Sequence, residues 1–148
     1  MGGHPYYYAV PYQPDINEAL QTLRKQEFEA GRYNPVVPFL SFEFDGTPPP
    51  APGKQHRSIE DALKSSDADG TRSILDVERI GSTPTFGVAT PVPSERLIEL
   101  YGTDKPLREM VATNMDFFEE IDRGQAVYIV LYRGDRPSEI FFAGMSYD

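Results

Sequence analysis

The last part of the chain has the most regular pattern of strand-forming residues. Residues 126–147 (AVYIVLYRGDRPSEIFFAGMSY) contain two runs rich in Val, Ile, Tyr and Phe, separated by the turn-forming segment RGDRPS. This order predicts a β-hairpin with a loop of about five or six residues. Both alternating sets of side chains in the first run are apolar, which predicts a strand that is covered on both faces and central to the core.

A helical pattern follows the N-terminal segment. Asp15 and Glu18 have the spacing of a capping box, and Gly31 stands at a typical stop position, so we predict a helix over residues 16–30. Its apolar residues recur at helical spacing and form one stripe that should pack on the sheet. Glu27 lies within that stripe.

A second long helix is predicted over residues 107–121, with Thr103 or Asp104 as its cap. Asn114 interrupts its apolar stripe. Three interpretations remain open for this residue, which are a satisfied buried amide, a break into two helices before Asp116, and a functional site; the first two together are favoured.

Shorter segments complete the pattern. Ser58 and Ser94 have the position of N-caps, and prolines within or after several strand-like runs favour edge strands or strand ends. The expected strands are residues 6–12, 36–44, 71–80 and 86–90, with a hairpin loop between the last two, and the expected short helices are residues 58–66 and 94–101.

These elements indicate one α+β domain spanning residues 1–148, with a mainly antiparallel sheet of about five or six strands covered by helices. The C-terminal hairpin should be central to its core. Residues 45–57 contain three consecutive prolines and predict an exposed loop. Whether the two long helices cover the same face of the sheet is left open by the sequence.

Composition narrows the classes of partner. The 23 acidic residues exceed the 14 basic ones and give a net charge of −9, which opposes binding to nucleic acids and to anionic membranes and favours basic proteins or divalent cations. There is no cysteine, no secretion signal and no apolar run long enough for a membrane span. We therefore expect a cytoplasmic protein, and the small size is typical of a bacterial one.

One segment resembles a known metal-binding motif. Residues 65–76 (SSDADGTRSILD) place oxygen-bearing side chains around a glycine, as the calcium loop of the EF-hand family does. The resemblance implies calcium ligands at Asp67, Asp69, Ser73 and Asp76. The sequence departs from the family because its last ligand is Asp instead of Glu and a strand is expected after the loop. The alternative, which we favour, is a turn held by local hydrogen bonds, with no cofactor.

The remaining candidates are ligand or interface residues. A carboxylate in an apolar stripe, as at Glu27, is a candidate acid–base group if it is buried, although we favour a surface Glu or one paired with a nearby Arg or Lys in the last turn of the helix. Tyrosines are common at interfaces, although we favour ordinary strand and half-buried sheet positions as the explanation for them. The candidates are Tyr6, Tyr8, Tyr12, Glu27, Tyr33, Asn114, Tyr128 and Tyr132.

No familiar catalytic motif is present, so catalytic residues are not assigned and an enzyme is not favoured. Our first hypothesis is a non-enzymatic protein-interaction or regulatory module with a basic protein partner. The alternative is a small-molecule or calcium-binding domain, or an enzyme, with a pocket between sheet and helices. Self-association into a homo-oligomer through the face of Tyr128 and Tyr132 is a further hypothesis.

Overall fold

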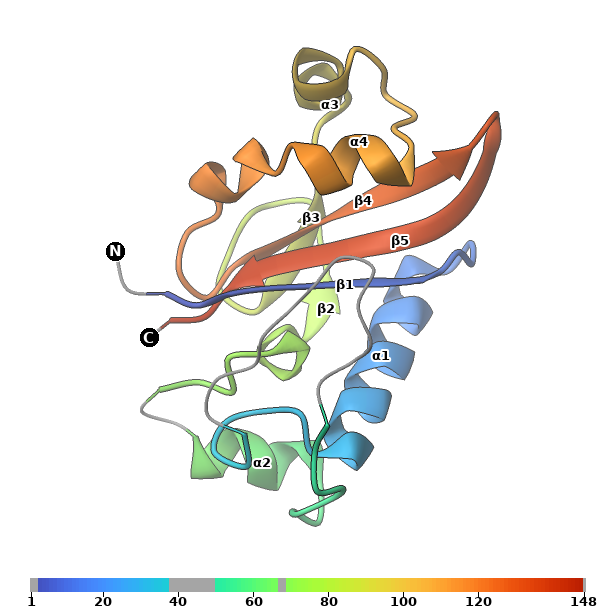
Figure 1. The fold of residues 1–148 in the computed structure, drawn as a ribbon. Helices are drawn as coiled ribbons and strands as arrows, with labels where there is room; N and C mark the ends of the chain where they lie inside the picture. The colour runs from blue at the N-terminus through green and yellow to red at the C-terminus, as the bar shows by residue number, and fades with distance from the viewer. Residues whose placement is uncertain (1–2, 38–49, 67–68, 148) are drawn as a thin grey trace.

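The computed structural model describes residues 3–37, 50–66 and 69–147, and its centre is a five-stranded sheet (Figure 1). The strand order is β1-β5-β4-β3-β2. The pairs β1–β5 and β4–β5 are antiparallel, whereas β2–β3 and β3–β4 are parallel. The strands are β1 (Pro5–Pro11), β2 (Arg79–Ile80), β3 (Val88–Pro91), β4 (Ala126–Arg133) and β5 (Arg136–Met145). The predicted α+β class is confirmed, with a mixed sheet.

Helices lie on both faces of this sheet. Figure 1 shows α1 on one side, and α3 and α4 on the opposite side. The question of whether the two predicted long helices share a face is thereby answered, because the sheet lies between them. The helices are α1 (Ile16–Ala30), α2 (Ile59–Ser65), α3 (Ser94–Tyr101) and α4 (Arg108–Thr113), and the 3₁₀ turns are η1 (Ile74–Asp76) and η2 (Asp116–Glu120).

The C-terminal hairpin is confirmed and lies in the interior of the sheet. β5 pairs with β1 on one side and β4 on the other, and β4 in turn pairs with β3. The loop is shorter than predicted, since Arg133 pairs with Arg136 and only Gly134 and Asp135 connect the strands. Gly134 has a φ of 64°, which allows the tight turn, and a register shift after Leu131 absorbs the irregular spacing.

Two apolar clusters fill the spaces above and below the sheet. The α1-side cluster contains Ile140 and Phe142 of β5 with Leu20 and Leu23 of α1. The α4-side cluster contains the other alternating residues of the central strands: Ile129, Leu131, Phe141 and Ala143, together with Val92, Leu97, Val111, Phe117 and Ile121. Both faces of β5 are therefore buried, whereas in β4 the face of Tyr128, Val130 and Tyr132 is only partly buried, so the predicted two-sided cover of that strand is incomplete.

Edge strand β1 is held in register by an unusually close contact. Tyr6 pairs with Gly144 of β5. A Cβ atom added to Gly144 would collide with the Tyr6 hydroxyl and ring, so the ring occupies the space that any other side chain would need. Tyr6 is fully buried as a result.

Two of the predicted helix caps are confirmed, those of α1 and α2. The Asp15 Oδ1 atom accepts a hydrogen bond from the Glu18 N–H group at 3.0 Å, and Gly31 ends α1 with a φ of 77°. Ser58 Oγ accepts a hydrogen bond from the Asp61 N–H group at 3.1 Å at the start of α2.

The predicted helix over residues 107–121 is two shorter elements. Asn114 ends α4, which confirms the predicted break before Asp116. Its Oδ1 atom accepts a hydrogen bond from the Asp116 N–H group at 3.0 Å, so the amide is satisfied, but it is only partly buried. The predicted cap is wrong, because Leu107 precedes α4 and Thr103 instead accepts a hydrogen bond from the Lys105 N–H group at 3.1 Å.

Three further details of the prediction are corrected. Ser94 is the first residue of α3, and the capping position is taken by Pro93 without a side-chain hydrogen bond. The predicted strand over residues 71–80 is a turn followed by η1 and the two-residue strand β2. The predicted hairpin to residues 86–90 is also wrong, since β2 and β3 are parallel.

Local hydrogen bonds explain why no long strand forms over residues 71–80. Ser73 Oγ accepts a hydrogen bond from the Leu75 N–H group at 3.2 Å and caps η1. Asp76 Oδ1 accepts one from the Thr71 N–H group at 2.9 Å. Short polar side chains that bond to nearby backbone groups compete with strand pairing.

Part of the predicted N-terminal region lies outside the described residues. The expected strand over residues 36–44 and the expected loop over residues 45–57 are described only at residues 36–37 and 50–57. Residues 50–57 contain no helix or strand, and the Gly53 N–H group donates a hydrogen bond to the Ala30 carbonyl at 2.9 Å. No helix within the described ranges is long and apolar enough to cross a membrane.

Candidate binding pocket at Asp76

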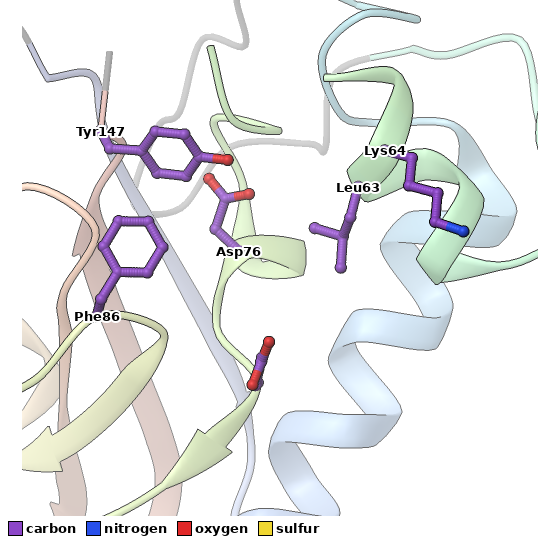
Figure 2. Close-up of a pocket in the computed structure, with 6 residues that line it drawn as sticks. Leu63, Lys64, Asp76, Phe86 and Tyr147 are labelled. Atoms are coloured by element: carbon purple, nitrogen blue, oxygen red, sulfur yellow. The ribbon is translucent and has the colours of Figure 1, made fainter. Parts of the chain in front are cut away.

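A pocket of about 210 Å³ lies on the α1 side of the molecule, where α2, η1 and the segment after β5 meet (Figure 2). Its walls come from four separate parts of the chain, which only the folded structure brings together. The lining residues are Leu63, Lys64, Asp76, Glu78, Phe86 and Tyr147.

The carboxylate of Asp76 is fixed at the wall of this pocket by the turn that precedes η1. Its Oδ1 atom accepts hydrogen bonds from the Thr71 N–H group at 2.9 Å and the Thr71 hydroxyl at 2.8 Å. The hydroxyls of Thr71 and Ser73 are also hydrogen-bonded, at 2.8 Å. Asp76 is only 7% exposed, so its position depends on these contacts and little on solvent.

The second carboxylate oxygen of Asp76 is different. Oδ2 is buried and has no hydrogen-bond partner among the residues that the structure describes. Burial raises the pKa of the Asp76 carboxyl, although hydrogen bonds from Thr71 and from the Arg72 backbone, and the nearby Arg24 charge, oppose that effect. A buried acceptor without a hydrogen-bond donor is energetically costly.

Two aromatic rings form the wall beside this oxygen. The ring centroids of Phe86 and Tyr147 are 4.9 Å apart, and Figure 2 shows both rings on one side of Asp76. A Cβ atom at Gly124 would collide with the Phe86 ring, and one at Gly70 would lie 2.9 Å from the Tyr147 ring and from Asp76 Oδ2. The two glycines therefore allow the rings and the carboxylate to approach the backbone closely.

Charge around the pocket is mixed. Glu78 adds a second carboxylate to the lining, and Lys64 adds one ammonium group. Figure 2 shows the Lys64 side chain directing its nitrogen away from Asp76. The Tyr6 hydroxyl is buried without a partner among the described residues, and its pKa is raised first by burial and then by the Asp76 charge.

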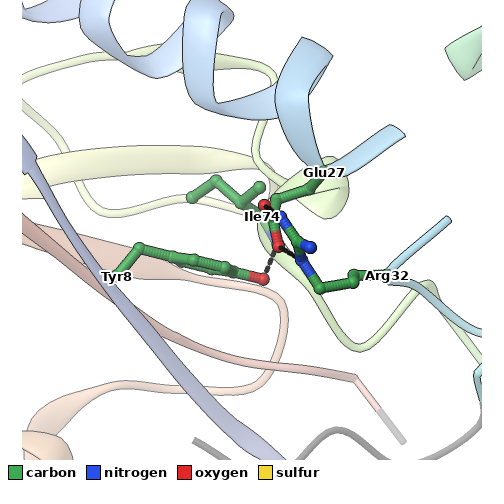
Figure 3. Close-up of polar contacts among 4 residues, drawn as sticks. All are labelled: Tyr8, Glu27, Arg32 and Ile74. Atoms are coloured by element: carbon green, nitrogen blue, oxygen red, sulfur yellow. Dashed lines mark hydrogen bonds and ion pairs between the residues drawn. The ribbon is translucent and has the colours of Figure 1, made fainter. Parts of the chain in front are cut away.

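A second polar cluster lies close by, between α1 and β1. Arg32 Nε donates to Glu27 Oε1 at 2.8 Å, and Arg32 Nη2 lies 2.6 Å from Glu27 Oε2, which makes a bidentate ion pair. Figure 3 shows the Tyr8 hydroxyl directed at this pair. The Ile74 N–H group donates to the Tyr8 oxygen at 3.3 Å. Burial and the Glu27 charge both raise the pKa of Tyr8.

This cluster joins two of the residues proposed from the sequence, Tyr8 and Glu27, to the wall that carries Asp76. Ile74 belongs to the same 3₁₀ turn as Asp76, and its N–H group bonds to Tyr8. Tyr6 lies beside Tyr8, with their ring centroids 6.2 Å apart, and Glu27 is buried in its ion pair with Arg32.

The other proposed residues lie elsewhere. Tyr33 is fully buried, and its hydroxyl is 2.6 Å from His56 Nδ1. Tyr12 and Tyr128 are partly buried and pack against the α1-side cluster, whereas Asn114 lies between α3 and η2, where its Nδ2 atom donates to the Leu100 carbonyl at 3.4 Å. Tyr132 has the Lys105 ammonium 5.8 Å from its ring centroid. The structure thus does not gather all of the candidates in one place.

The predicted calcium ligands are only partly described. Asp67 lies outside the described residues, Asp69 is exposed, and the Ser73 and Asp76 side chains bond to the local turn. Within the described residues, no group of three or more His, Asp or Glu side chains could hold a metal ion. Calcium binding by this segment remains a prediction.

Sequence reasoning missed five of the pocket residues: Leu63, Lys64, Glu78, Phe86 and Tyr147. The sequence contains no spacing that connects them, because they lie far apart in the chain and meet through the fold. The one usable signal was the polar run at residues 65–76, which included Asp76 for a different reason.

Comparison with protein-family models, with curated proteins and with solved structures gives no match. A function for this chain must therefore be inferred from the chemistry of the pocket.

Proposed function

We propose that this chain is a small acidic binding module, without catalytic activity of its own, that holds a basic partner protein at the Asp76 pocket. The observation that carries this proposal is the buried Asp76 Oδ2 atom, which lacks a hydrogen-bond donor among the described residues. The Asp76 side chain lines a pocket. A partner that supplies a donor with positive charge would satisfy that atom and offset its charge.

The rim of the pocket also supports an interaction role. Phe86 is 60% exposed and packs against Tyr147, so a large aromatic surface is available beside the acidic group. Aromatic residues are enriched in protein interfaces, where they contribute much of the binding energy. The net charge of −9 favours the approach of a basic partner over long range.

A panel of immobilised peptides of equal length, with basic, neutral and acidic compositions, tests this proposal. We expect the wild-type protein to be retained by basic peptides and by few others. Phe86→Ser should reduce that retention about tenfold, because it removes the aromatic rim. Ile98→Ser is the matched control, since Ile98 on α3 is also a large exposed apolar residue, at 51%.

Equal retention by acidic and basic peptides would contradict the proposal. The proposal would also fail if Ile98→Ser reduced retention as much as Phe86→Ser, because retention would then not depend on the pocket face. Measuring peptide retention at two salt concentrations distinguishes the contribution of long-range electrostatic attraction from that of the aromatic contact at Phe86. The electrostatic attraction weakens with salt, whereas the aromatic contact persists.

A second candidate function is a small-molecule site with acid–base chemistry. The raised pKa of Asp76, beside the second carboxylate of Glu78, is the observation that favours it, because catalytic carboxyl groups often have such values. Thermal-shift screening against a metabolite panel tests it, since a ligand that binds only the folded state raises the unfolding temperature.

A further inference from the structure

We infer that the Asp76 pocket is a site for a primary ammonium group, supplied by a lysine side chain of the partner. This inference rests on the proposed function and names the chemical group that the pocket recognises. Three features of the pocket support it, which are the free carboxylate oxygen, the aromatic wall and the arrangement of the remaining charges.

The free oxygen requires a ligand that donates a hydrogen bond. Asp76 Oδ2 is buried and lacks a donor among the described residues, while Oδ1 already accepts two hydrogen bonds from Thr71. A quaternary ammonium ion has no N–H group, so it would leave Oδ2 without a donor. A ligand with an N–H group directed at Oδ2 removes this cost.

The number of free oxygens favours an ammonium group over a guanidinium group. A guanidinium group binds best when two oxygens of one carboxylate accept its parallel N–H groups. In Asp76 only Oδ2 is free, because Thr71 occupies Oδ1. An ammonium group is compact and satisfies a single oxygen without this requirement.

The aromatic wall and the second carboxylate favour a cation. Phe86 and Tyr147 place two rings beside Asp76, and the face of an aromatic ring attracts a cation within about 6 Å. Glu78 adds negative charge to the lining. Leu63, on the opposite wall, offers an apolar surface for the methylene groups of a lysine side chain.

The size of the pocket exceeds what a single water molecule requires. A water needs only about 10–15 Å³ of such space. The pocket contains about 210 Å³, so a short alkyl chain with its ammonium group fits as well as the solvent that it displaces.

Lys64 is the one residue of the lining that opposes a cation. Figure 2 shows its nitrogen directed away from Asp76, and the residue is exposed, so its charge is well solvated. We therefore expect Lys64→Met to bind amines as tightly as the wild type or more tightly.

Titration of the folded protein with n-butylamine tests the inference, with affinity measured by calorimetry or by NMR shifts of residues around the pocket. Tetramethylammonium and methylguanidinium serve as comparison probes of the same charge. We expect n-butylamine to bind at least about tenfold more tightly than either, because tetramethylammonium has no N–H donor and methylguanidinium cannot use its paired N–H groups on a single free oxygen.

Asp76→Asn is the decisive variant. The asparagine Oδ1 atom can still accept both hydrogen bonds from Thr71, whereas an NH₂ group replaces the free oxygen. The variant should bind n-butylamine about tenfold or more weakly, as expected for loss of a charge-assisted hydrogen bond. Glu95→Gln on α3 is the control for loss of one charge and should leave the affinity unchanged.

A lysine-containing peptide and the same peptide with norleucine in place of lysine identify the source of the amine. Tighter binding of the lysine peptide than of n-butylamine supports a protein partner. If n-butylamine binds through Asp76 but the peptide binds no better, the ammonium site is real and the proposed function is wrong. If basic peptides bind through Phe86 while Asp76→Asn has no effect, the proposed function stands and the ammonium inference is wrong.

Discussion

The two faces of the sheet are packed in different ways. The α4-side cluster consists of aliphatic and aromatic side chains that pack under α3, α4 and η2. The α1 side also has an apolar cluster, but buried polar groups adjoin it. These are the Glu27–Arg32 ion pair, the Tyr6 and Tyr8 hydroxyls and the Asp76 carboxylate.

We propose that this difference separates stability from function within the described part of the chain. Apolar packing is favourable wherever it occurs, whereas a buried charge or an unsatisfied hydroxyl is costly unless it is compensated. Protein structures keep such costs mainly where a ligand or a mechanism requires them. The α4 side is therefore expected to stabilise the domain, and the α1 side to bind its ligand.

The largest expected effect is on the apolar side. Phe117→Ala should lower the free energy of unfolding by about 3–5 kcal/mol, because Phe117 is only 2% exposed and packs against Phe118 and Phe141. Urea denaturation measures this change. The n-butylamine affinity of the folded variant should stay within about twofold of the wild type. A large loss of affinity in the folded protein would show that the two faces are not separate.

A somewhat smaller effect is expected for the buried ion pair. Arg32→Met should lower the free energy of unfolding by roughly 2–4 kcal/mol, since it leaves the buried Glu27 carboxylate without its partner. Adding Glu27→Gln to the Arg32→Met variant should restore part of the lost free energy of unfolding. A double-mutant cycle by urea denaturation measures the coupling, and additive losses would mean that the pair contributes nothing beyond its separate side chains.

The smallest expected change in the free energy of unfolding is an increase, and it concerns Asp76. Burial raises the pKa of the Asp76 carboxyl in the folded state, so the folded protein binds this proton more tightly than the unfolded chain does. The stability contributed by Asp76 is then full below the unfolded pKa and is lost as the pH rises through the folded value. Asp76→Asn should therefore be at least as stable as the wild type at pH 7.

The pH dependence of the stability difference between Asp76→Asn and the wild type gives a sharper test. The advantage of Asp76→Asn should shrink as the pH falls through the window between the folded and unfolded pKa values of Asp76. Thermal unfolding of both proteins from pH 7 to pH 3 measures it. A variant that is less stable than the wild type at neutral pH would indicate that the carboxylate is compensated in the folded state.

Elements with local signals could be predicted from the sequence. The α1 helix begins at a cap formed by Asp15 and Glu18 and ends at Gly31, and all three signals lie within or beside the segment itself. The hairpin of β4 and β5 has the same character, since its strand-forming runs and its turn are contiguous. Only the length of the loop was wrong, because pairing extends through Arg133 and Arg136 close to the turn.

Elements that depend on competition between local and distant contacts could not be predicted. In residues 71–80 the strand-like composition of the apolar residues was outweighed by hydrogen bonds from nearby backbone groups to Ser73 and Asp76. The parallel pairing of β2 with β3 requires a connection that returns the chain to the same end of the sheet before β3 begins. The strand propensity of the residues does not reveal the direction of pairing.

In the candidate site, too, the residues with a local sequence signal could be predicted, and those that meet only through the fold could not. Glu27 was recognised because a carboxylate in an apolar stripe is visible on a helical wheel. Phe86 and Tyr147 could not be connected, because their rings meet only when the loop before β3 and the segment after β5 come together. Asp76 is predicted as a calcium ligand, and the structure shows that it lines a pocket, with its Oδ1 atom bonded to Thr71 and its Oδ2 atom buried without a donor among the described residues.

The contact between Tyr6 and Gly144 has a consequence for how the chain selects its fold. Three consecutive tyrosines begin β1 after Pro5, so a one-residue shift of β1 along β5 would place Tyr7 opposite Gly144 and would turn Tyr6 to the other face of the sheet. Gly144 fixes where on β5 a buried ring can lie, because it is the one residue of β5 without a Cβ atom. The alternation of the two faces of β1 then determines which tyrosine lies there, so the glycine and the alternation together favour the native alignment.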